Sequence, residues 1–334
     1  MKRAIPWVLV TVALAALPLA TKSPYVIGTM CFIALHGTLA VGMGVLLESA
    51  GIFSLAHPTF FGLGAYSGAI LAVRNVAAPW LGTLLGSGFV TAVSWLIGAP
   101  LLRLKGFYLA CATFCLLVIV EISLGQLGSL TGGHEGLVGI PALTIAGFAF
   151  EKDVHFYYLT WGFCLGQLWF LSNVMGGRVG RAIRAPRDSE PAARCMGIDI
   201  PRYKLQVFMV TAAIASITGS LYCFYLRFTQ PGIFGVPLLI ELNTMIIIGG
   251  GSRIYGPLIG AFVITWLREL IHGYLGSLLP RMTGEVDAIF FGLLIIVILL
   301  FAPTGITGWA EGVAARIRRL TGGGSVPAAG AEAP

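Results

Sequence analysis

Apolar stretches long enough to cross a lipid bilayer recur along almost the whole chain. Residues 205–226, for example, contain no Asp, Glu, Lys or Arg. A transmembrane helix needs about 20 such residues to cross the hydrocarbon core. Only 10% of the 334 residues are charged, against roughly 25% in soluble domains. The sequence therefore predicts an all-α polytopic membrane protein.

We predict about ten transmembrane helices, within a range of about 8–11, from the length that one crossing requires. The stretch 52–73 is rich in glycine and contains His57-Pro58, which favours a broken or partly re-entrant helix. The stretch 237–249 is short and gives the weakest prediction. The ten predicted spans are residues 5–20, 25–47, 52–73, 81–102, 106–125, 155–174, 205–226, 237–249, 254–267 and 288–301.

Two pairs of glycines stand four residues apart within or beside these spans, Gly64 with Gly68 and Gly256 with Gly260. Small residues at this spacing let two helix backbones approach closely inside a membrane. We therefore interpret both pairs as packing positions rather than ligand contacts.

One long polar segment, residues 175–204, interrupts the apolar chain near its middle and carries seven of the 21 basic residues. Lys and Arg are retained on the cytoplasmic side during membrane insertion. With the N-terminus in the cytoplasm, the basic residues that follow the fourth, sixth, eighth and tenth predicted spans all lie on that side. The sequence predicts cytoplasmic termini and a cytoplasmic loop at 175–204, where a cytoplasmic partner is expected to dock.

Three regions follow from this organisation: an N-terminal transmembrane segment at 1–24, a transmembrane domain at 25–310, and a basic, then low-complexity cytoplasmic tail at 311–334. Residues 2–20 also fit a cleaved signal peptide, because Lys-Arg precedes an apolar run. That alternative leaves the orientation of every later span unchanged.

The six cysteines, of which five lie inside predicted spans, are expected to be free, buried thiols. Cys111 and Cys115 share a helix face, but no His or second cysteine pair with zinc spacing accompanies them. No metal or other cofactor is therefore expected. The basic residues cluster at span ends and in one loop rather than along a groove-sized face, so nucleic-acid binding is not expected either.

Residues 188–198 carry the signals that begin and end a short helix. Asp188 or Ser189 can cap its first turn, and Pro191 suits that turn. Gly197 suits the left-handed position that follows a helix. The prediction is a helix of about two turns, too short to be stable alone in water. We expect it to pack against the spans of this chain or against a partner, whereas the alternative is a solvated loop.

The same residues carry a family resemblance. Glu190, Ala192, Ala193 and Gly197 resemble the Glu-Ala-Ala, three residues, Gly pattern of ATP-binding-cassette importer permeases. Over about residues 35–301, the chain is similar to the second permease subunit of branched-chain amino acid importers, the LivM type. Its pattern departs from the family at Pro191, where Ile or Ala usually follows the Glu, and at Arg253. The blocks that carry the similarity are residues 54–66, 130–137, 180–184 and 248–257.

The resemblance implies a permease subunit of the bacterial inner membrane that moves branched-chain or other small amino acids or amides. It implies four kinds of partner: a homologous LivH-type permease, two cytoplasmic ATP-binding subunits, a periplasmic substrate-binding protein and the lipid bilayer. The residues that it assigns to ATPase coupling are Arg184, Glu190, Ala192, Ala193 and Gly197. The chain has no Gly-x-x-x-x-Gly-Lys-Ser/Thr loop, so we expect ATP hydrolysis in partner subunits and no enzymatic activity here.

The alternative function is an ion-coupled secondary transporter, which needs coordinating groups near the membrane midplane. Acidic residues deep in the predicted spans are nearly absent. The candidates for the substrate pathway are His57, Glu121 and Asn243, since polar groups at membrane depth are candidates for function. Each has a structural alternative: His57 can bond a carbonyl that Pro58 frees, Glu121 can reach the membrane interface, and Asn243 can lie with Glu241 in a loop.

Overall fold

The computed structural model describes residues 17–18, 23–145, 147–250, 253–275 and 305–308. The predicted span 288–301 and the tail 311–334 lie outside the described residues, as does almost all of the span 5–20. The predicted number of spans therefore stays a prediction. Within the described residues, five helical segments are long and apolar enough to cross a membrane: Pro24–Ser49, Pro79–Leu101, Phe107–Gln126, Ile200–Leu226 and Pro231–Gly249.

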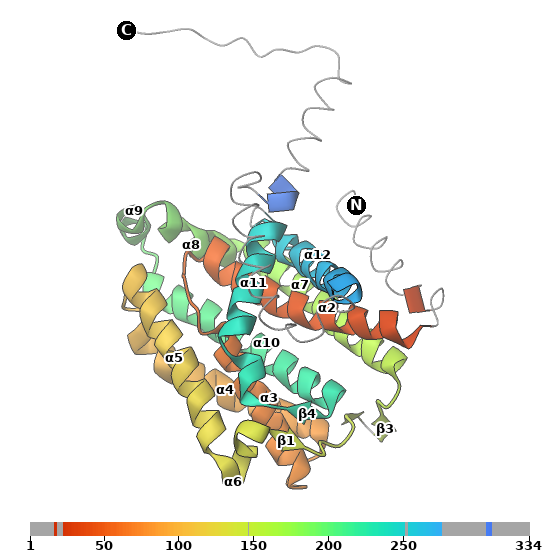
Figure 1. The fold of residues 1–334 in the computed structure, drawn as a ribbon. Helices are drawn as coiled ribbons and strands as arrows, with labels where there is room; N and C mark the ends of the chain where they lie inside the picture. The colour runs from red at the N-terminus through yellow and green to blue at the C-terminus, as the bar shows by residue number, and fades with distance from the viewer. Residues whose placement is uncertain (1–16, 19–22, 146, 251–252, 276–304, 309–334) are drawn as a thin grey trace, which may run out of the picture.

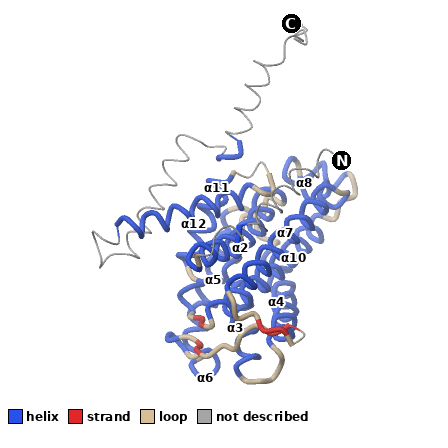
Figure 2. The backbone as a smooth tube through the Cα atoms, turned by 90° about the vertical axis from the view of Figure 1, so that its right-hand side faces the viewer, coloured by secondary structure: helices blue, strands red, loops and turns tan. Residues whose placement is uncertain are grey.

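Helix accounts for most of the described backbone (Figure 2). Each predicted span within it corresponds to a helix, although α10 begins at Ile200 rather than 205 and α12 continues to Leu275 rather than 267. The helices are α2 (Pro24–Gly44), the π-helix η1 (Val45–Ser49), α3 (His57–Val73), α4 (Pro79–Leu101), α5 (Phe107–Gln126), α6 (Gly128–Thr131), the 3-10 helix η2 (Gly133–Glu135), α7 (Asp153–Gly176), α8 (Arg178–Asp188), α9 (Glu190–Cys195), α10 (Ile200–Leu226), the 3-10 helix η3 (Pro231–Phe234), α11 (Val236–Gly249) and α12 (Gly256–Leu275).

Short elements mark the two ends of the helix bundle (Figure 1). The helices α8 and α9 lie together at the upper left of Figure 1, and α6 and the strands lie along the bottom. Strand β1 (Leu137–Val138) pairs antiparallel with β4 (Phe228–Thr229), and β2 (Thr144–Ile145) pairs with β3 (Phe148–Ala149). The β1–β4 pair joins the long connection after α6 to the end of α10.

Helix α2 is the central element of the bundle, because nearly every residue from Ile27 to Gly44 is buried. A helix that is hydrophobic all round is expected to be surrounded by others. In contrast, α4 exposes large apolar side chains such as Phe89 and Leu96, and α5 exposes Phe107 and Ile119. These outer faces are suited to lipid or to a partner subunit.

Glycines bring helices into close contact, as their spacing predicts. A Cβ atom on Gly64 of α3 would collide with the main chain of Ser216 of α10, and Ser220 Oγ donates a hydrogen bond of 2.8 Å to the Gly64 carbonyl. A Cβ atom on Gly260 of α12 would likewise collide with the carbonyl of Met245 in α11. Both glycine pairs therefore belong to helix packing surfaces.

The predicted break at His57-Pro58 does not occur within a helix, whereas the alternative of a partly re-entrant helix stays a prediction. Helix α3 begins at His57, and Pro58 lies in its first turn. Proline is tolerated there because the first N–H groups of a helix have no partner within the helix. It therefore frees no carbonyl for His57, and the residues from Ile52 to Ala56 form a non-helical connection instead.

The prediction that the cysteines in the spans are buried holds for only some of them. Cys31, Cys164 and Cys223 are buried free thiols, whereas Cys111 and Cys115 are free but exposed on α5. The error has a simple cause, because the apolar composition of a span does not distinguish a face that contacts protein from one that contacts lipid.

Candidate functional site

The predicted short helix between Ser189 and Gly197 is present as α9. Ser189 occupies the N-cap, and its side chain accepts a 3.4 Å hydrogen bond from the Ala192 N–H. Gly197 has a φ of +74°, and the Ile198 N–H donates a 3.1 Å hydrogen bond to the Ala193 carbonyl. The sequence folds here because a capping hydroxyl begins the helix and a left-handed glycine ends it.

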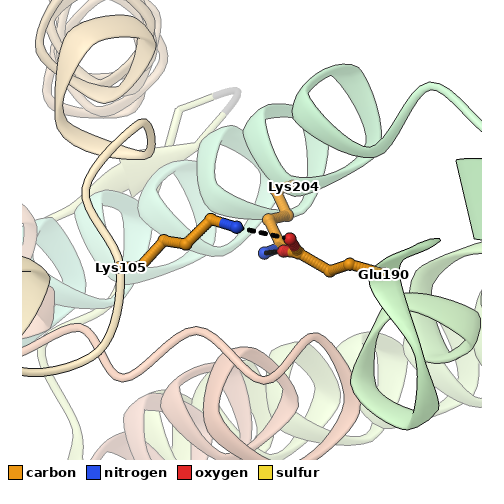
Figure 3. A network of polar contacts seen from close by, with 3 residues as sticks. All are labelled: Lys105, Glu190 and Lys204. Carbon is orange, nitrogen blue, oxygen red and sulfur yellow. Dashed lines mark hydrogen bonds and ion pairs between the residues drawn. The ribbon is translucent and has the colours of Figure 1, made fainter.

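The carboxylate of Glu190 ties this helix to two distant parts of the chain (Figure 3). Its Oε2 atom lies 2.6 Å from Nζ of Lys105, in the connection between α4 and α5. Its Oε1 atom lies 3.0 Å from Nζ of Lys204, near the start of α10. Hydrogen bonds from these two ammonium groups lower the pKa of Glu190 to about 2. Glu190 therefore fastens α9 to its own bundle.

The other residues of α9 divide between an inner and an outer face. Ala193 is buried against the bundle, whereas Ala192, Arg194 and Met196 are exposed. Gly197 is exposed as well, and a Cβ atom there would meet no other atom within 4 Å. The outer face of α9 is thus small, partly apolar and open for a partner to contact.

Helix α8, which was not predicted from the sequence, connects the basic segment to two more helices. Its apolar residues Ala182 and Ile183 are buried, and its arginines lie outside. Arg184 donates a 2.8 Å hydrogen bond to the Met175 carbonyl in the last turn of α7. Arg187 donates to the carbonyl of Glu48 in the π-helix that continues α2.

The signal for α8 was a repeat of arginines three residues apart, with apolar residues between them. Pro186 obscured it, because proline disfavours a helix interior. Here it lies in the last turns of α8. Together, α8 and α9 contact the ends of α2, α7 and α10 and the connection between α4 and α5. A displacement of this segment can therefore reach most of the bundle.

The three predicted pathway residues do not come together. His57 is buried beside Gly42 of α2 and Gln167 of α7, so it belongs to the core between three helices. The carboxylate of Glu121 lies against Gly235 at the N-terminus of α11. Asn243 donates a 2.8 Å hydrogen bond to a carbonyl of its own helix. Each residue occupies a separate place in the bundle.

The loop alternative for Glu241 and Asn243 is wrong, because both lie within α11. Glu241 is buried and its Oε2 atom lies 2.8 Å from Nη2 of Arg268 in α12. This ion pair was not predicted from the sequence. Its signal was a single acidic residue in one predicted span and a basic residue directly after the next span.

Among the described residues, no group of three or more His, Cys, Asp and Glu side chains is placed to hold a metal ion. The polar features of this part of the chain are instead ion pairs and hydrogen bonds between helices. They are suited to positioning helices and contacting charged groups.

Comparison with known proteins gives a consistent result. A family model described as the permease component of the branched-chain amino acid transport system matches residues 25–299. The chain is 25% identical over 320 residues to the high-affinity branched-chain amino acid transport system permease protein LivM of Escherichia coli (strain K12), covering 87% of this chain and 73% of that protein. It is also 25% identical over 297 residues to the permease protein LivH of the same organism, covering 83% of this chain and 92% of that protein.

Among solved structures, PsaBC from Streptococcus pneumoniae in complex with Fab matches with a TM-score of 0.46 and 13% sequence identity. The match covers 93% of this chain and 99% of that chain. This similarity is too low to carry a structural argument.

Proposed function

Since this chain belongs to the family of permease components of branched-chain amino acid transport systems, we propose that it translocates a substrate when separate ATPase subunits move its α8–α9 segment. The chain is a multi-pass membrane transport component and not a catalytic subunit. The proposed substrates are branched-chain or other small amino acids or amides, delivered by a periplasmic binding protein at the bacterial inner membrane.

The attachment of α9 is the observation that carries this proposal. Glu190 joins the helix to Lys105 and Lys204 at once, while the opposite face with Ala192 and Met196 stays exposed. A partner that binds the outer face of α9 can therefore move this helix. Because the inner face of α9 is bonded to the bundle, the movement is passed on to the bundle. Each exposed ion pair contributes only about 0–1 kcal/mol, so the bonds serve as a geometric connection rather than a large source of stability.

A second connection runs through α8 to the central helix. Arg187 bonds to the carbonyl of Glu48, which lies in the π-helix at the end of α2. Single π-helical turns are frequent at functional sites. We propose that this turn takes up part of the movement when α8 shifts. The two connections give the bundle the coupled element that switching between outward and inward access requires.

The proposed assembly contains this chain, a homologous LivH-type permease and two cytoplasmic ATP-binding subunits. The α8–α9 segment then lies on the cytoplasmic side, in agreement with its five arginines. The exposed apolar faces of α4 and α5 are available to the second permease or to lipid. A transport-competent particle that contains only this permease and its ATPases would contradict the pairing.

The test is Ala192→Trp on the outer face of α9, in the reconstituted complex with its ATPases and binding protein. We expect the substituted chain to assemble, because the new ring points away from the bundle, but ATP-driven uptake of tritiated leucine to fall at least about tenfold through a disrupted contact worth 1.4 kcal/mol or more. Val76→Trp is the matched control, since Val76 is also exposed but lies in the α3–α4 connection.

Wild-type uptake by Ala192→Trp would contradict the docking role of α9. Uptake by this chain without ATPase subunits, driven by an ion gradient, would instead support a secondary transporter and overturn the proposed function.

A further inference from the structure

A pair of opposite charges joins α11 to α12, with the carboxylate buried and the guanidinium partly exposed. Oε2 of Glu241 lies 2.8 Å from Nη2 of Arg268, and the two side chains are 8% and 28% exposed. Arg268 lies near the middle of α12. Glu241 lies within Pro231–Gly249, one of the segments long and apolar enough to cross a membrane, and ionisable residues in such segments are rare and usually functional.

Such a pair is a poor way of stabilising two packed helices. Removing both charges from water costs more than their mutual attraction usually returns, and apolar residues of similar size hold helices together as well or better. The rest of the α11–α12 contact shows this, because Gly260 packs directly on the backbone of Met245. The ion pair therefore calls for a role beyond packing.

Two polar atoms near the ion pair have hydrogen-bonding capacity that the pair does not use. Oε1 of Glu241 and Nδ1 of His36 are buried without a hydrogen-bond partner among the described residues. Both charges of the pair are close enough to His36 and Tyr222 to interact with them electrostatically. Buried polar atoms without partners are rare in native proteins, and each calls for an explanation such as a functional role or a bound water or ion.

Aromatic rings form an apolar wall beside these groups. The ring of Phe32 lies 6.3 Å from that of His36 and 6.1 Å from that of Tyr222, and the rings of His36 and Tyr222 are 6.2 Å apart. Helices α2, α10, α11 and α12 thus bring a carboxylate, a guanidinium, an imidazole and two aromatic rings to one region.

We propose that this cluster is a transient binding site for the zwitterion of an apolar α-amino acid on its way through the permease. Arg268 binds the ligand carboxylate, Glu241 binds the ligand ammonium group, and Phe32 and Tyr222 contact its side chain. The proposal rests on the proposed function and narrows its substrate class.

The charge balance supports a zwitterion over a neutral ligand. Glu241 and Arg268 neutralise each other in this structure. An amino acid that enters between them offers one charge to each, so that no charge is left alone in a medium of low polarity. A neutral amide or urea offers weaker dipoles and would leave the two ions poorly compensated. Because the pair is in direct contact in this structure, the ligand enters only when α11 and α12 separate.

The experiment uses the complete complex with its partner permease, ATPases and binding protein in proteoliposomes. It measures tritiated leucine taken up per ATP hydrolysed. In Glu241→Gln/Arg268→Gln both charges are replaced by amides that can still bond to each other, so no lone charge is buried. We expect the leucine-to-ATP ratio to fall at least about tenfold, because hydrogen bonds to charged groups are stronger than those between neutral groups.

The matched control is Glu269→Gln, which removes a charge from the adjacent position of α12, where Glu269 accepts a hydrogen bond from Tyr25. A purely structural role for the pair predicts that uptake and ATP hydrolysis fall together, with an unchanged ratio. A double variant with the wild-type ratio overturns the proposal.

If the double variant does not assemble, the single variant Glu241→Asp tests the proposal. It retains the charge but withdraws the carboxylate by one methylene group, and we expect it to assemble with a lowered ratio, whereas a wild-type ratio overturns the proposal. Failure of the wild-type complex to take up any amino acid would instead contradict the proposed function, independently of these variants.

Discussion

The Oε1 atom of Glu190 lies 3.0 Å from Nζ of Lys204, so the short helix α9 is tied to the beginning of the long helix α10. The Gly64 main chain packs directly on α10 farther along, at Ser216. A movement of α9 therefore reaches a helix that is in close contact with α3. This chain of contacts is the physical basis of the coupling that we propose.

Glu190→Gln should destabilise the attachment of α9 above about pH 4.5 and have progressively less effect as the pH falls toward 2. The pKa of the folded carboxyl group is lowered from 4.5 to about 2, so its contribution is present above the unfolded pKa and is lost as the pH falls through that interval. The side chain is 25% exposed, so we expect about 1 kcal/mol after solvent screening. Hydrogen exchange of the α9 amides, with Glu151→Gln as control, measures it. An equal difference at pH 3 and pH 7 would contradict the prediction.

Gly197→Val should uncouple the ATPases from transport, whereas Gly197→Asn should not. Gly197 has a φ of +74° and free space around it, so the effect comes from backbone strain and not from a clash. A left-handed conformation costs a residue with a Cβ atom about 1–2 kcal/mol, and Asn tolerates it better. The measurement is stimulation of ATP hydrolysis by the loaded binding protein. Equal stimulation in both variants would show that the exit turn of α9 has no part in coupling.

Local sequence signals predicted α9 because its beginning and end depend on neighbouring residues. Ser189 supplies the cap and Gly197 the left-handed turn, whatever the rest of the chain does. The direction of Glu190 was not predictable in the same way. It depends on Lys105, which is 85 positions away in the chain, and no local pattern reports which lysine a carboxylate will meet.

The same limit explains the pathway residues. The apolar spans showed where helices form, but not which faces meet. The Glu241–Arg268 pair arises from the packing of α11 on α12, and the burial of His57 arises from its contact with α2 and α7. Both features depend on tertiary packing, which the local sequence does not report. The glycine spacing predicted more, because Gly64 and Gly260 do lie at close helix contacts. The spacing did not identify the partner helix.

Gly64→Val should prevent stable folding of the chain, because the new side chain would meet the main chain of Ser216. Overpacking of a side chain against movable neighbours typically costs about 1–3 kcal/mol, and a helix backbone yields less readily. Gly166→Ala in α7 is the control, since a Cβ atom there meets nothing within 4 Å. It should be neutral or stabilising by up to about 1 kcal/mol. Thermal unfolding in detergent compares the two, and equal midpoints would refute the close α3–α10 contact.

Glu121 should face an aqueous route or the membrane interface rather than lipid. Its side chain is only partly exposed, and its carboxylate lies at the N-terminus of α11. A helix N-terminus stabilises a negative charge by about 0.3–1 kcal/mol. Glu121→Gln should therefore cost no more than this and preserve folding. Thermal unfolding of the two proteins in detergent gives the difference.

The environment of position 121 is tested directly by Glu121→Cys in a chain without native cysteines, three of which are exposed. We expect it to react with a water-soluble thiol reagent in at least one nucleotide state. Ile119→Cys is the matched control on α5, because Ile119 is exposed on an apolar outer face. If lipid covers that face, a water-soluble reagent does not reach the cysteine, and position 119 stays unlabelled. An unlabelled cysteine at position 121 in every nucleotide state would place that side chain against protein and remove Glu121 from the aqueous route.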